Sequence, residues 1–98
     1  MQFLMIAQAA EGTQIEQILP FVKPEAAKSW EYYASGLIRS MHYIADMSGV
    51  VFLWEAPSLE AVNEAISQLP MKQAGVLQFK VIPLKPYTGI EELFAQSK

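Results

Sequence analysis

The sequence predicts a small α+β domain, with a four-stranded antiparallel sheet and helices covering one face of it. The chain has 98 residues, enough for one hydrophobic core, so residues 1–98 are expected to form a single domain. Short apolar segments without a helical period alternate with segments that have one, as expected for strands and helices in turn. Of all residues, 52% are hydrophobic and 17% are charged, which is more apolar material than one core of this size needs.

The first third of the chain is predicted to hold one strand and two helical pieces. Residues 2–9 are apolar, end before a Glu-Gly pair and are expected to form the first strand. Thr13 and Glu16 have the spacing of a capping box, and Pro20 and Pro24 separate this short piece from a helix over 25–35. Gly36 is placed to end that helix in a left-handed cap. The apolar residues at helical spacing predict its buried face: Ala26, Trp30, Tyr33, Ala34 and Leu37.

The remainder is predicted to form a hairpin, a helix and a last strand. Strands over 37–45 and 50–56 flank a turn at 46–49, in which Asp46 is a typical turn residue. Ser58 caps a helix that Pro70 ends, and the last strand covers 75–83. A second capping box opens a C-terminal helix at Thr88 and Glu91. The apolar stripe expected on the middle helix is Leu59, Val62, Ile66 and Leu69.

This order, βαββαβ with a C-terminal helix, corresponds to two split βαβ units with right-handed crossovers, which is the ferredoxin-like arrangement. The strands are apolar on both faces: Phe3 and Met5 alternate with Leu4 and Ile6. Helices cover only one face of such a sheet, so the other face requires a partner. We therefore expect a homodimer in which two sheets pack face to face as a dimeric α+β barrel.

Composition argues against several classes of function. The net charge is −3 and the seven basic residues are scattered, so the chain lacks the basic stripe that nucleic-acid binding requires. Its apolar runs are far shorter than the roughly 20 residues that span a bilayer, and no signal peptide is visible, which predicts a cytoplasmic protein without membrane contact. One His, no Cys and no glycine-rich phosphate loop predict neither a metal site nor a nucleotide cofactor.

Four segments spread over nearly the whole chain carry a family resemblance: 1–7 (MQFLMIA), Trp30-x-x-Tyr33-x-x-Gly36-Leu-Ile-Arg39, Leu69-Pro-Met and Ile82-Pro-Leu-Lys-Pro-Tyr-Thr-Gly. In these segments the sequence resembles muconolactone-isomerase-like proteins of the dimeric α+β barrel superfamily, which also contains YciI-like proteins and cofactor-free monooxygenases. The resemblance implies the fold, which hosts many unrelated activities. The His–Asp dyad of YciI-like members has no match, because the single His lies on the second predicted strand.

The sharpest candidate for catalysis is a pair formed by His42 and Glu55. If the hairpin closes with Ala45 opposite Val50, Ser40 faces Glu55, and His42 becomes a diagonal neighbour of Glu55 on the same face. A His oriented by a carboxylate can act as a general base near neutral pH. The alternative is a polar contact at the dimer seam, and a register slip of one residue would separate the pair.

The substrate-binding candidates are the single arginine and an aromatic group. Arg39 lies among apolar strand residues and is expected either to hold a substrate carboxylate or to stack on Trp54. The aromatic side chains are expected either to line a pocket for a flat ring or to pack in the core. They come from the first long helix and the hairpin: Trp30, Tyr33, Tyr43 and Trp54.

These residues favour a small cofactor-independent enzyme of isomerase or lyase type, acting on an organic acid, lactone or phenol by proton transfer. Proton abstraction next to a carbonyl needs only a base, an anion anchor and a hydrogen-bond donor. Two alternatives remain open at this point. One is a cofactor-free monooxygenase that uses the Trp and Tyr side chains, and the other is a non-catalytic dimer that binds a small molecule or serves in assembly.

Overall fold

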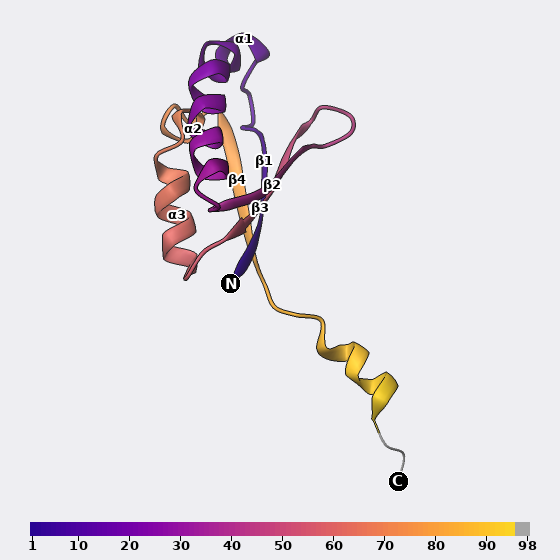
Figure 1. The fold of residues 1–98 in the computed structure, drawn as a ribbon. Helices are drawn as coiled ribbons and strands as arrows, with labels where there is room; N and C mark the ends of the chain where they lie inside the picture. The colour runs from indigo at the N-terminus through magenta and orange to yellow at the C-terminus, as the bar shows by residue number, and fades with distance from the viewer. Residues whose placement is uncertain (96–98) are drawn as a thin grey trace.

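Four strands form one antiparallel sheet in the order β2-β3-β1-β4 in the computed structural model, which describes residues 1–95. The strands are β1 (Gln2–Ala9), β2 (Ile38–Tyr43), β3 (Gly49–Glu55) and β4 (Leu77–Leu84). Helices α2 (Val22–Ala34) and α3 (Leu59–Ser67) lie against one face of the sheet (Figure 1). The predicted α+β class and the ferredoxin-like βαββαβ order are confirmed.

The core lies between the sheet and the helices. Phe3 pairs with Trp54 and Met5 with Phe52 across β1 and β3, so that their side chains share the helix-covered face. Phe3 and Trp54 are completely buried, and Val62 of α3 is buried against the same cluster. Removing side chains of this size from water stabilises the fold by roughly 1.5–3 kcal/mol each.

The opposite face of the sheet is also apolar, as the strand sequences predict. Alternation along the strands leaves β1 with Leu4 and Ile6 on this outer face and β3 with Leu53, all of them half-buried. These side chains are partly buried only by residues of the neighbouring strands, because no helix covers this face of the sheet (Figure 1). The sheet-mediated homodimer that would cover it remains a prediction.

The start of the helical region differs from its predicted form. Helix α1 (Ile15–Ile18) continues through a 3-10 turn (Leu19–Phe21) into α2, which begins three residues before the predicted position. Pro24 lies in the first turn of α2, where its missing N–H is not needed. The predicted Thr13–Glu16 capping box is wrong by one residue, since the backbone N–H of Gln14 donates to Oε1 of Gln17 at 2.8 Å. Glutamine can serve in the box because the oxygen of its side-chain amide accepts a hydrogen bond from a backbone N–H, as a glutamate oxygen does.

The predicted buried face of α2 is wrong. Trp30 and Tyr33 are 63% and 43% exposed, whereas Ser29 is buried. The orientation of α2 is set instead by Tyr32, whose hydroxyl donates to the carbonyl of Ala65 on α3 at 2.8 Å and whose ring lies 5.7 Å from that of Trp54. Gly36 adopts φ 86° after the end of α2, which confirms the left-handed cap.

The predicted hairpin forms with a different register. The N–H of Ile44 donates to the carbonyl of Gly49 at 2.8 Å. The last pair before the turn is therefore Ile44 with Gly49, whereas the predicted pair was Ala45 with Val50. Tyr43 therefore lies opposite Val50 rather than Phe52. A shift of two residues keeps the side chains from Ser40 to Tyr43 on their predicted faces, whereas the bulge between Ile38 and Ser40 places Ile38 on the other face, in the core. Asp46 is a turn residue as predicted, because its Oδ1 accepts from the N–H of Ser48 at 2.9 Å. Hydrogen bonds from the side chain and then the backbone of Ser48 lower the pKa of the Asp46 carboxyl.

The second crossover follows its predicted form closely. Ser58 caps α3 by accepting from the N–H of Ala61 at 3.1 Å. Pro70 ends this region and occupies the first turn of a short helix, α4 (Pro70–Gln73). Strand β4 starts two residues later than predicted and continues through Pro83, which an edge strand accommodates because its outward N–H side needs no partner.

The chain beyond β4 extends away from the sheet and the helices (Figure 1). The predicted C-terminal helix is a 3-10 helix, η2 (Thr88–Phe94), and its residue at the capping position is Tyr87 without a side-chain cap, so the predicted Thr88–Glu91 box does not form. We refer to residues 85–95 as the C-terminal arm. Within residues 1–95 no helix is both long and apolar enough to cross a lipid bilayer.

Candidate functional site

A cavity of about 740 Å³ lies between α1, α2 and the helix-covered face of the sheet. This volume is within the range of small-ligand sites, roughly 300–1,000 Å³. Its wall is mostly apolar, and its ionisable residues are Glu25, His42 and Tyr43. The sheet forms the floor, with side chains from all four strands: Met5, Ala7, Met41, Val50, Phe52, Leu77 and Phe79.

The cavity exists because the side of α2 nearest to it carries small or polar residues. Ala26 and Ser29 line it from the helix, and Ala7 and Ala9 line it from β1. None of these side chains is long enough to fill the space between the layers. Aromatic and aliphatic side chains on either side keep the layers apart, so the volume stays open rather than collapsing.

Glu25 is the carboxylate in the wall of this cavity. Its Oε1 accepts a hydrogen bond of 2.8 Å from the backbone N–H of Met71, at the start of α4. Burial raises the pKa of Glu25 above its ordinary value, and the hydrogen bond from Met71 opposes that rise only in part. The bond engages one oxygen, so Oε2 can take up a proton from a bound molecule. A carboxylate with a raised pKa is a stronger base than one in water.

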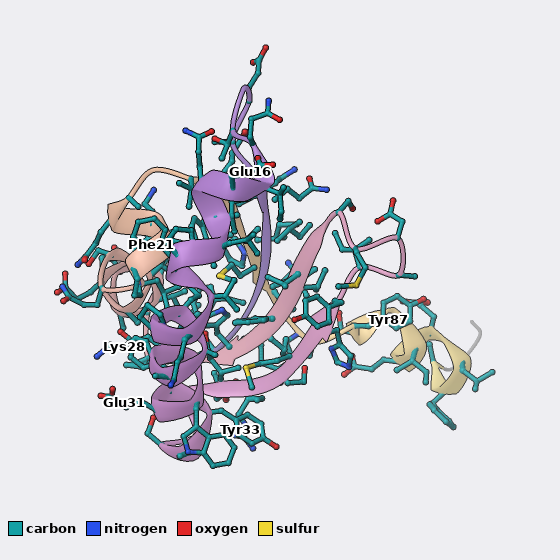
Figure 2. All side chains as sticks on the ribbon, turned by 90° about the horizontal axis from the view of Figure 1, so that it is seen from above. Glu16, Phe21, Lys28, Glu31, Tyr33 and Tyr87 are labelled. Atoms are coloured by element: carbon teal, nitrogen blue, oxygen red, sulfur yellow. The ribbon has the colours of Figure 1, made fainter. Side chains whose placement is uncertain are left out.

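Apolar residues surround the opening of the cavity, beside α2 and the β2–β3 hairpin. Trp30 lines the wall and lies 5.7 Å from the ring of Tyr33, which extends the aromatic surface outward along α2. Tyr43 and Met47 border the opposite side and are 71% and 66% exposed. Figure 2 shows Tyr33 at the end of α2 that leads to β2, on the outside of the helix. A flat ring entering here would meet aromatic faces before it reached Glu25.

The predicted contact between His42 and Glu55 is wrong. His42 lies opposite Val51, and Glu55 is four residues farther along β3, roughly 13 Å away at the rise of an extended strand. Glu55 instead approaches the amino terminus, with Oε1 3.7 Å from the Met1 nitrogen. His42 borders the cavity and Glu55 does not. The two-residue register shift explains the separation, since it moved Glu55 away along the strand while leaving both residues on one face.

The other predicted site residues divide between the cavity and its surroundings. Trp30 and Tyr43 line the cavity, whereas Arg39, Tyr33 and Trp54 do not. Trp54 is a core residue with no exposed surface. Arg39 is exposed at a bulge in β2, between Ile38 and Ser40, where the extra residue has no partner in β3.

From the sequence, Glu25 was expected only to begin a helix. A signal was present, because Glu25, Ser29 and Tyr32 recur at helical spacing as a polar stripe in a largely apolar chain. A polar stripe of this kind is equally typical of a solvent-exposed helix face. The neighbouring stripe with Ala26, Trp30 and Tyr33 is more hydrophobic and was therefore predicted to be buried. Among residues 1–95 no group of three or more His, Asp and Glu side chains lies close enough together to hold a metal ion.

Comparison with known proteins relates this fold and cavity to one family. The family model described as muconolactone delta-isomerase matches residues 1–89. The chain resembles the crystal structure of a muconolactone isomerase with a TM-score of 0.72 and 18% identity, over 89% of this chain and 91% of that one. It also resembles 5-chloro-2-hydroxyhydroquinone dehydrochlorinase from Burkholderia phenoliruptrix, in complex with 2,5-dihydroxybenzoquinone, with a TM-score of 0.74 and 19% identity, over 91% and 98% of the two chains. No curated protein matches this sequence.

Proposed function

Because this chain belongs to the muconolactone delta-isomerase family, we propose that it is a small-molecule isomerase or lyase that acts by proton transfer in the cavity beneath α2. The observation that carries the proposal is Glu25, a half-buried carboxylate with a raised pKa in the wall of an apolar cavity. Glu25 is proposed as the base. It takes the role that the sequence predicted for His42 or Glu55.

The proposed step requires only groups that this cavity contains. Oε2 of Glu25 removes a proton from a carbon next to a carbonyl, and the electron pair moves into the carbonyl system. In an isomerisation the same proton returns from Glu25 to another carbon, and the double bond moves with it. In an elimination a leaving group departs with the electron pair instead. The apolar wall solvates the ionised carboxylate less well than water does, and this burial raises the pKa of Glu25.

The lining supports a small, flat, oxygenated ring as the substrate. Trp30 offers a ring face for stacking, and the hydroxyl of Tyr43 at the opening offers a donor for the substrate's oxygens. The two structural relatives are named for a lactone and for a chlorinated hydroxyhydroquinone, which share this chemistry. Arg39 lies outside the lining, so the predicted anchoring of a substrate carboxylate by Arg39 stays a prediction.

The test combines ligand binding with isotope exchange. Muconolactone and 2,5-dihydroxybenzoquinone are screened for thermal stabilisation, and binding lactones are then incubated with the protein in D₂O. Enzymatic proton transfer is expected to give deuterium incorporation or isomerised product, followed by NMR. Removing a general base typically slows such a step by about 10²–10⁴-fold, so Glu25→Gln should reduce the rate by that factor.

Glu25→Gln is also the matched control for a purely structural role. The Gln side chain retains an oxygen that can accept the Met71 hydrogen bond, so the variant should fold and bind ligand while losing turnover. Full turnover by the variant would overturn the assignment of Glu25 as the base. Binding of a lactone by the wild type without exchange or turnover would favour the small-molecule binding module over the enzyme.

A further inference from the structure

Ser29 is the single buried polar residue among residues 1–95, and it lies in the wall of the cavity. It is 6% exposed, whereas every other residue of α2 is half-buried or exposed. A hydroxyl that is taken out of water loses its hydration, and a hydrogen bond to another group normally offsets this loss. A serine buried as deeply as Ser29 is therefore expected to have a partner.

The described part of the chain provides no such partner. Serines in helices commonly donate to a carbonyl about one turn earlier. Two other serines at helix ends do so here, since Ser35 donates to the carbonyl of Tyr32 at 3.0 Å and Ser67 donates to that of Glu64. Ser29 makes no hydrogen bond of this kind within residues 1–95, and the space in front of it is the cavity. Its hydroxyl is thus available to a molecule bound there.

Ser29 lies one helical turn after Glu25, on the same side of α2. Residues four apart on a helix have their Cβ atoms roughly 5–6 Å from each other, and both of these residues line the cavity. Side chains of a helix lean toward its N-terminus, which directs the Ser29 hydroxyl toward the part of the cavity that Glu25 faces. A base and a donor at this separation can act on two neighbouring groups of one small molecule, a C–H and the carbonyl beside it.

The other hydroxyl groups in the lining are less sheltered than that of Ser29. Thr13 is half-buried, and Tyr43 and Ser48 are exposed. A hydrogen-bond donor stabilises a negative charge most strongly where few water molecules compete with it. Among the hydroxyl groups of this cavity, the one on Ser29 is therefore best placed to stabilise charge on a bound molecule.

We propose that Ser29 binds the carbonyl oxygen of the substrate and stabilises the enolate that forms when Glu25 removes the neighbouring proton. The proton moves from carbon to Glu25, the C–H electron pair becomes the C=C bond of the enolate, and the negative charge moves to the oxygen held by Ser29. Ser29 keeps its own proton throughout, because it only donates a hydrogen bond. This inference rests on the proposed function, and it specifies a substrate with a ring carbonyl next to a C–H.

Binding of two probes tests the donor without any turnover. Coumarin is a flat lactone, and 2H-chromene is the same ring system without the carbonyl oxygen. In NMR titrations, Ser29→Ala should weaken the binding of coumarin by about 2- to 10-fold, the contribution of one neutral hydrogen bond, and leave the binding of 2H-chromene unchanged. Glu25→Gln should bind both probes as the wild type does. The proposal is overturned if the wild type does not bind coumarin, or if Ser29→Ala binds it equally well.

Two further measurements separate this role from a structural one. Ser29→Ala combined with Ala26→Ser moves the hydroxyl to another position of the same wall and should not restore coumarin binding. Ser29→Ala alone should raise the midpoint of thermal unfolding, because it removes an unpaired buried hydroxyl and because alanine favours a helix. A lower midpoint, or restored binding in the double variant, would contradict the proposal.

Isotope exchange provides the kinetic measurement. Loss of a donor to a developing oxyanion typically lowers kcat by about 10²–10³-fold, which is the effect expected for Ser29→Ala. KM should rise by no more than about tenfold, since the hydrogen bond becomes strong only in the enolate. Equal kcat in the wild type and Ser29→Ala would overturn the role of Ser29 and leave Glu25 as the base. Coumarin binding that depends on Ser29, without exchange by the wild type, would instead overturn the proposed enzyme and leave a carbonyl-binding site.

Discussion

Glu25, the proposed base, combines a hydrogen bond that helps to fix the fold with a position that is costly for an ionised carboxylate. Its carboxylate accepts a hydrogen bond from Met71, which helps to fix α4, yet its position in an apolar wall raises its pKa. An ionised group in such a wall is less well solvated than in the unfolded chain. Residues that violate the usual rules of burial in this way are concentrated at functional sites.

This cost predicts a pH dependence of stability. Because the native pKa of Glu25 lies above its ordinary value of 4.5, the native state binds the proton more tightly than the unfolded state does. The contribution of Glu25 to the free energy of unfolding is therefore fully present below its ordinary pKa and is lost as the pH rises through the raised native pKa. In Glu25→Gln this loss should be absent, so the variant should gain stability relative to wild type as the pH rises from below 4.5 through the raised native pKa of Glu25.

Urea denaturation at several pH values measures this difference. Wild type and Glu25→Gln should differ little at the acidic end and diverge as the pH rises, with the variant more stable. The same substitution is expected to abolish turnover, so the two effects have opposite signs. A constant difference between the two proteins at every pH would contradict the shifted ionisation of Glu25.

At the scale of elements, the β2–β3 hairpin forms one side of the cavity opening, and Gly49 holds it against β1. A Cβ added at Gly49 would collide with the carbonyl oxygen of Ala7 and would lie 2.7 Å from Cγ of Gln8. The carbonyl belongs to a central strand that cannot move without breaking its pairing on both sides. The close approach of two backbones therefore requires glycine at this position.

Gly49→Ala should destabilise the protein by about 1–3 kcal/mol, as overpacked sites do. The neighbouring Ser48→Ala serves as the control, because Ser48 is exposed in the turn and its replacement should change stability by no more than about 0.5 kcal/mol. Thermal unfolding followed by circular dichroism compares the two variants. Equal midpoints for Gly49→Ala and wild type would show that β1 and β3 can separate without cost at this point.

At the scale of the whole molecule, the apolar outer face of the sheet is the feature that predicts a homodimer rather than a monomer. Leu53 lies near the middle of this face on β3, one of the two central strands. Leu53 pairs with Leu4 of β1 on one side and with Ser40 of β2 on the other, and neither residue carries a charge that could pair with an introduced lysine. The dimer expected from the strand sequences places Leu53 in the interface between two sheets.

Leu53→Lys is therefore expected to produce a folded monomer. A buried charge without a partner costs roughly 2–5 kcal/mol, which weakens the dimer by about 30- to 5,000-fold. Light scattering should give twice the 11.0 kDa mass for wild type and a mass near 11.0 kDa for the variant. Asn63→Lys, on the exposed side of α3, should remain dimeric. A wild-type mass of 11.0 kDa at micromolar concentration would contradict the predicted dimer.

Local patterns in the sequence determined the elements of this fold. The Ser58 cap, the left-handed Gly36, the Asp46 turn and the bounds of β1 depend on a few neighbouring residues, and the structure confirms each of them. The order of these elements and the apolar character of both strand faces then predicted the α+β class. Here short-range preferences and the overall fold agree, as is usual for natural sequences.

Only the tertiary structure decided the candidate site. Glu25 meets Met71 across 46 residues of sequence, and Tyr32 meets Ala65 across 33, and these contacts orient α2. The apolar stripe with Trp30 suggested the opposite orientation, because hydrophobicity alone does not record which faces of distant segments fit together. The separation of His42 from Glu55 has a similar cause, since one hydrogen bond between Ile44 and Gly49 sets the register of the hairpin. Burial and register arise from packing between distant residues, whereas the patterns read along the chain are local.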